Sequence, residues 1–173
     1  MKKWILRIAV VLIVAVIAFV GVKEYKALTT PQKIHYHAGF VVFVNNKKID
    51  FSKAQYMSIS PCILHGEEAD DASPSSIQLD KAHLHDFVGD VVHVERTGAK
   101  WGDLFVNIHY PMDYSKVTAY VNGKQVQDIQ DQPIILEQSV VFFIGKNDIQ
   151  KDLKQAVTKA HIEWEAIHSV ECS

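Results

Sequence analysis

The chain has 173 residues, of which 48% are hydrophobic, so it is long enough for one membrane segment and one domain with a substantial core. Its formal net charge is −2, but residues 1–26 carry five Lys/Arg and one Glu, which leaves thirteen Lys/Arg against nineteen Asp/Glu, or −6, for residues 27–173. A domain with that charge repels phosphate backbones, and we expect no nucleic acid among its partners.

The N-terminus combines basic residues with an unbroken apolar run. Lys2, Lys3 and Arg7 precede or flank the run that ends at Val22, and residues 4–22 are about long enough to span a bilayer. The positive-inside tendency predicts a single-pass membrane helix with a cytoplasmic N-terminus and the rest of the chain outside the cell membrane. A cleaved signal peptide is the alternative, although no Ala-x-Ala site follows the run.

The chain therefore divides into three parts. We predict a membrane anchor over residues 1–26, a linker over 27–33 and an extracytoplasmic, histidine-rich domain over 34–173. In an oxidising compartment, Cys62 and Cys172 are expected to form a disulfide that ties the C-terminus to the domain. Two free thiols, or Cys62 as a thiolate ligand near His65, stay open as alternatives.

Periodicity and turn signals predict the elements of the domain in order. A hairpin is expected from a strand over 35–44, the turn Asn45-Asn46 and a return strand over 47–51, and a second hairpin surrounds Asn122-Gly123. Further strands are predicted over 76–79, 90–96 and 139–144, and a short helix over 100–109.

The last predicted element is one amphipathic helix that begins at the N-cap Asn147 and continues to Ile167, with apolar residues at helical spacing on one face. His161 and His168 on this helix are interpreted as ordinary, partly exposed residues. These elements predict an α+β domain with a mostly antiparallel sheet and a C-terminal helix. A β-sandwich or a cupin-like barrel with an added helix is the alternative.

Paired histidines are the most specific chemical feature of the sequence. His-x-His occurs at His35/His37 and at His83/His85, and in extended chain such a pair presents both imidazoles on one face. First-row metal ions need three or four such donors at about 2 Å, with carboxylates as ligands or as acceptors that orient the rings. We predict a metal site whose ligands are His83, His85 and His93, with His35 or His37 as a fourth and with Asp86 and Glu95 as orienting carboxylates or substitutes.

The motif His-Leu-His-Asp-Phe-Val-Gly-Asp-Val-Val-His-Val-Glu over 83–95, followed by Lys-Trp-Gly-Asp-Leu-Phe, is similar to one found in a group of uncharacterised proteins. These prokaryotic proteins are membrane-anchored or secreted, and they also have an early His-x-His and a Val-Asn-Gly-Lys hairpin. The resemblance covers about residues 35–145. It supports the grouping of the motifs and implies no particular activity.

Three classes of function remain open. The first is a membrane-anchored protein that binds a transition metal, and the nitrogen and oxygen ligands favour Zn(II), then Cu(II), over Cu(I). The second is a metal-dependent hydrolase or hydratase of the cell envelope, in which a metal-bound water reacts. The third is a structural or interaction module in which the histidines only stabilise the fold. Protein partners are not indicated by the sequence.

Overall fold

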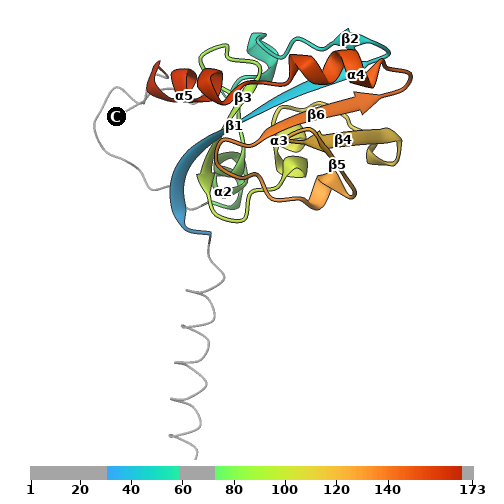
Figure 1. Ribbon diagram of the computed structural model, residues 1–173. Coiled ribbons are helices and arrows are strands. Elements are labelled where there is room, and N and C mark those ends of the chain that lie inside the picture. Colours follow the sequence, from blue (N-terminus) through green and yellow to red (C-terminus); the bar gives the residue numbers. More distant parts are fainter. Residues whose placement is uncertain (1–30, 59–72, 169–173) are drawn as a thin grey trace, which may run out of the picture. The chain divides into compact units, whose positions relative to one another are not determined.

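The computed structural model describes residues 31–58 and 73–168, which form a mixed α+β domain from Lys33 onward (Figure 1). The predicted membrane anchor and the residues Cys62, His65 and Cys172 lie outside these ranges. Among the residues that are described, no helix combines the length and the apolar character needed to cross a bilayer.

Six strands form one open, curled sheet. They are β1 (Lys33–Val44), β2 (Lys47–Lys48), β3 (Val91–Arg96), β4 (Val117–Val121), β5 (Lys124–Val126) and β6 (Ser139–Ile144). The strand order is β2-β1-β6-β4-β5, and β3 lies off this path. Both β2 and β3 pair with the same edge of β1: β2 with its C-terminal end and β3 with its N-terminal half. All strand pairs in the described residues are antiparallel except β1 with β6. The prediction of an α+β domain with a mostly antiparallel sheet is therefore confirmed.

Both predicted hairpins are present, and their turns explain why. Asn45 and Asn46 have φ angles of 52° and 65°, and Asn122 and Gly123 have φ angles of 48° and 78°. Two successive left-handed residues make the tight turn whose twist matches that of the flanking strands. The first return strand is shorter than predicted, because pairing stops at Lys48.

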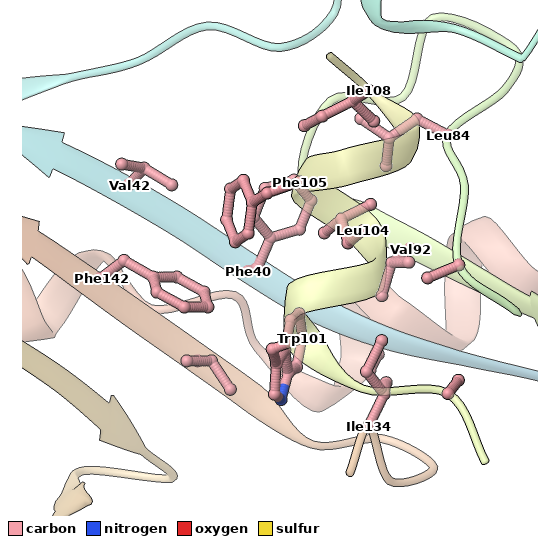
Figure 2. Close-up of a cluster of buried hydrophobic side chains, with 14 of the residues drawn as sticks. Phe40, Val42, Leu84, Val92, Trp101, Leu104, Phe105, Ile108, Ile134 and Phe142 are labelled. Carbon is pink, nitrogen blue, oxygen red and sulfur yellow. The ribbon is translucent and has the colours of Figure 1, made fainter. Parts of the chain in front are cut away.

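Helix α3 (Trp101–Asn107) covers one face of the sheet, as predicted for residues 100–109. Its Trp101, Leu104 and Phe105 pack against Phe40 of β1 and Phe142 of β6, and all five side chains are buried (Figure 2). The Trp101 indole Nε1 donates a hydrogen bond of 3.1 Å to the Oε1 of buried Gln138. This face is therefore the main hydrophobic core.

The opposite face is covered by the C-terminal segment, which is not the single helix that was predicted. Helix α4 (Ile149–Asp152) continues into a 3₁₀ turn, the chain then becomes extended at Ala156, and α5 (Lys159–His168) follows. The break lets Val157 sit directly on Gly39, where an added Cβ would lie 2.5 Å from the Val157 Cβ. The N-cap of α4 is Asp148, not Asn147, since the Asp148 carboxylate accepts the amide of Lys151 at 3.2 Å.

The predicted strand over 76–79 is wrong, because these residues belong to helix α2 (Pro74–Lys81). Ser73 caps the helix, with its hydroxyl accepting the amide of Ser76 at 3.2 Å, and Pro74 occupies the first turn. A serine cap followed by proline is a helix-start signal that outweighs the short apolar alternation of the segment. Helix α2 lies beside β3, and the histidine-rich segment begins directly after it at Ala82.

Candidate metal centre

Three histidines form a row across three adjacent extended segments. His37 of β1 and His93 of β3 are Cα partners in the antiparallel pair. On the other side of β3, His83 forms an isolated bridge with His93, with amide-to-carbonyl distances of 3.1 and 3.0 Å in the two directions. Directly opposed residues project on the same side of a sheet, so the three imidazoles share one face.

The alternation of the strands explains why the histidines all project on this face. Ala38, Leu84 and Val92 each adjoin one of the row's histidines in sequence, have no solvent exposure, and belong to the main core. Because successive side chains in extended backbone point to opposite faces, burial of these three directs His37, His83 and His93 to the other side. On β1 this face continues through Gly39 to the apolar residues packed under Val157.

Two further histidines bring the number in this cluster to five among the described residues, and we call these five the histidine cluster: His35, His37, His83, His85 and His93. The cluster contains two overlapping groups that can hold a metal ion, an outer group of His35, His37 and His93 and an inner group of His83, His85 and His93. In each group the three ligand atoms all lie within 4.8 Å of one another. The structure brings the predicted His83, His85 and His93 together, and both His35 and His37, of which one was expected as a fourth ligand, lie beside them.

His35 lies at an irregularity in β1. The pairing of β1 with β3 shifts register between Lys33 and Tyr36, which is the position of a β-bulge. Bulges locally re-aim side chains. The imidazole centroid of His35 lies 4.9 Å from that of His37 and 5.6 Å from that of His93, and His35 is the exposed member of the cluster.

The rings are close enough for coordination. His37 Nε2 lies 2.9 Å from His93 Nε2 and 3.1 Å from His93 Nδ1, and the ring centroids of His85 and His93 are 3.5 Å apart. Ligand nitrogens around a tetrahedral Zn(II) with bonds of 2.0–2.1 Å are about 3.3 Å apart. The ligand atoms within each group are at most 4.8 Å apart, so small rotations of the imidazole rings would bring them to the spacing that an ion requires.

Two of the rings are held by hydrogen-bond acceptors on the side away from the ligand nitrogen. His83 Nδ1 donates to the carbonyl oxygen of Leu79 at 3.2 Å, and His85 Nδ1 donates to the carboxylate of Asp86 at 2.7 Å. A carbonyl and a carboxylate accept protons only, so in the neutral rings Nδ1 carries the proton and Nε2 keeps its lone pair. Such contacts fix the tautomer and orientation of metal-binding histidines.

Burial keeps the centre of the cluster neutral. His37, His83 and His93 are only 5%, 9% and 6% exposed. Desolvation is the main cause that lowers the pKa of His37 to about 4, and it also lowers the pKa of His93 and of His83. Neighbouring imidazoles add to the effect, whereas the Glu95 carboxylate opposes it at His83. Neutral imidazole is the form that binds a metal.

The carboxylates predicted for the site have different places. Asp86 contacts His85, as expected for an orienting group, and it occupies a left-handed turn with a φ of 55°. Glu95 follows His93 on the same face of β3 and influences His83 electrostatically. Neither belongs to a three-ligand group among the described residues. Sequence reasoning missed the Leu79 carbonyl, because a backbone acceptor leaves no signal in residue types.

Comparison with protein-family models, with curated proteins and with solved structures gives no match. The chemistry of the histidine cluster is therefore the basis on which function is argued.

Proposed function

We propose that this chain is a membrane-anchored extracytoplasmic protein that binds one transition-metal ion, Zn(II) or Cu(II), in the histidine cluster. The observation that carries the proposal is the convergence of five imidazoles from three segments, two of them with Nδ1 held by an acceptor. A purely structural role gives no reason to bury three neutral imidazoles side by side in place of apolar residues.

The choice of metal follows from the donors. Among the described residues both groups consist of imidazoles. Imidazole suits Zn(II) and Cu(II), whereas Cu(I) prefers sulfur ligands. Elemental analysis of the full chain, purified without a histidine tag, tests the proposal. We expect about one Zn or Cu per chain, and a protein that contains neither ion and takes up neither would refute it.

The proposed location rests on the sequence. Residues 4–22 are long and apolar enough to span a bilayer, and the basic residues before them place the histidine-rich domain outside the cytoplasm.

A metal-dependent hydrolase or hydratase is the second candidate. Each group supplies three histidines, and a tetrahedral ion held by three protein ligands keeps one position for water. Substitution of Co(II) for the native ion distinguishes the two functions. A bound water that ionises near pH 7 would change the Co(II) absorption spectrum over that range, whereas a fourth histidine ligand would leave the spectrum constant.

A further inference from the structure

The two groups of the histidine cluster differ in access and in anchoring. The outer group contains exposed His35, next to buried His37. The inner group contains the two rings whose Nδ1 atoms are held by Leu79 and Asp86. His93 is common to both groups and lies between them, paired with His37 on one side and with His83 on the other.

Only one ion at a time fits this arrangement. Among the described residues neither group contains a carboxylate, and a neutral imidazole has one free lone pair, so His93, which both groups share, binds only one dication at a time. Two dications a few ångströms apart would also repel each other. The two groups are therefore alternative positions for a single ion.

Resting on the proposed metal-binding function, we propose that the cluster transfers its ion between two positions, with the outer group as the loading position and the inner group as the holding position. His35 binds the arriving ion together with His37 and His93. The bonds to His35 and His37 then break as bonds to the Nε2 atoms of His83 and His85 form, while His93 stays bound.

This exchange is balanced without a further reactant. Each imidazole uses one lone pair and keeps its single proton, so the ion changes neither its charge nor its oxidation state. Retaining one ligand throughout avoids a free dication in the buried centre, which would be costly. The inner group holds the ion longer because its rings are already oriented.

Loading kinetics test the proposal. The full chain, purified in detergent without a tag, is mixed with Zn(II), and release is then followed with a chromogenic chelator. For His35→Ala we expect loading and release to slow by at least about tenfold, while the equilibrium Kd changes by less than about threefold. For His85→Ala we expect the Kd to weaken by at least about 100-fold, as for a lost ligand. His168→Ala, which removes an exposed imidazole outside the cluster, should match wild type.

Three results would overturn the transfer mechanism. They are equal losses of affinity in His35→Ala and His85→Ala, unchanged kinetics in His35→Ala, or two ions bound per wild-type chain. His35 is exposed and His85 half-buried, so both variants keep the main core intact, and circular dichroism verifies their folding. A wild-type chain that binds no Zn(II) or Co(II) would instead refute the metal-binding function itself.

Discussion

His37 and His93 face each other across the β1–β3 pair, with His37 Nε2 2.9 Å from His93 Nε2. Two neutral imidazoles at this distance form one N–H···N hydrogen bond, because one nitrogen donates and the other accepts. A second proton would place two donors against each other. A metal ion that accepts a lone pair from each ring is a second way to satisfy this contact.

Acid should destabilise the metal-free protein. An unfolded histidine has a pKa of about 6.5, whereas His37 in the fold has a pKa of about 4. Between these values the unfolded state binds a proton that the folded state does not, so the free energy of unfolding falls as the pH falls, by at most about 1.4 kcal/mol per pH unit for each such histidine. Above pH 6.5 the contribution is complete. Urea unfolding from pH 8 to pH 4 measures it.

A His37→Leu variant supplies the control for this pH dependence. It has no imidazole to protonate, so its unfolding free energy should vary less steeply with pH than that of wild type between pH 6.5 and 4. Equal slopes in the two proteins would show that His37 does not contribute.

Loss of His83 and His85, the two ligands that only the inner group contains, should abolish tight metal binding. The variant His83→Ala/His85→Ala keeps only the outer group, so Zn(II) uptake at micromolar concentration should disappear. An ion at 100 times its Kd stabilises the folded state by about 2.7 kcal/mol, which corresponds to roughly 5–10 °C in Tm for a domain of this size. Chelator should lower the wild-type Tm by this amount and leave the variant unchanged. If chelator has no effect on wild type, the histidines are structural.

The Asp86 carboxylate should matter through His85. Asp86→Asn should weaken Zn(II) binding by about 10–100-fold, because an amide holds the His85 tautomer less firmly than a carboxylate at 2.7 Å. Asparagine tolerates the left-handed backbone at this position, so the substitution changes the acceptor and not the turn. Asp113→Asn, at an exposed carboxylate that contacts Ser115, is the matched control. Equal Kd values for both variants would exclude an orienting role.

Replacing Leu84 should lower both the stability of the domain and its affinity for metal. It is fully buried between His83 and His85 in sequence, so Leu84→Ala should cost about 2–5 kcal/mol of unfolding free energy and also weaken metal binding, because both flanking rings lose their support. Leu136→Ala, at a leucine that is 58% exposed, should have little effect on either measurement. Denaturant unfolding and Zn(II) titration of the two variants make the comparison. An unchanged Kd in Leu84→Ala would show that metal binding does not depend on the packing of this core residue.

The membrane anchor is tested independently of the metal. If residues 4–22 span the bilayer, the protein should remain in the membrane fraction after a carbonate wash, and protease added outside the cell should digest the domain. A mature N-terminus near Gly21 would identify the segment as a cleaved signal peptide instead.

Several features of this protein were determined by local sequence alone. The Asn45-Asn46 and Asn122-Gly123 turns, helix α3 and the strands β1, β3 and β6 follow from residues that are neighbours in the chain, because turn chemistry and side-chain periodicity act over a few residues. The same short-range logic placed both imidazoles of each His-x-His pair on one face. On chemical grounds the sequence predicted His83, His85 and His93 as ligands with His35 or His37 as a fourth, and the structure brings all five side chains close together.

Other features were decided by contacts between distant segments. The C-terminal segment breaks at Ala156, where Val157 packs on Gly39, 118 residues earlier in the chain, and helical periodicity in the sequence does not reveal that contact. The parallel pairing of β1 with β6 likewise depends on the route of the chain between them.

The division of the histidine cluster into two groups is also a tertiary effect. It depends on the register of β1 against β3 and on the backbone carbonyl of Leu79 that orients His83. Register and backbone acceptors are set by how whole strands and helices pack. Residue types therefore predicted a metal site. The packed fold determined which histidines are exposed and which rings are held by acceptors, and it placed His93 in both groups.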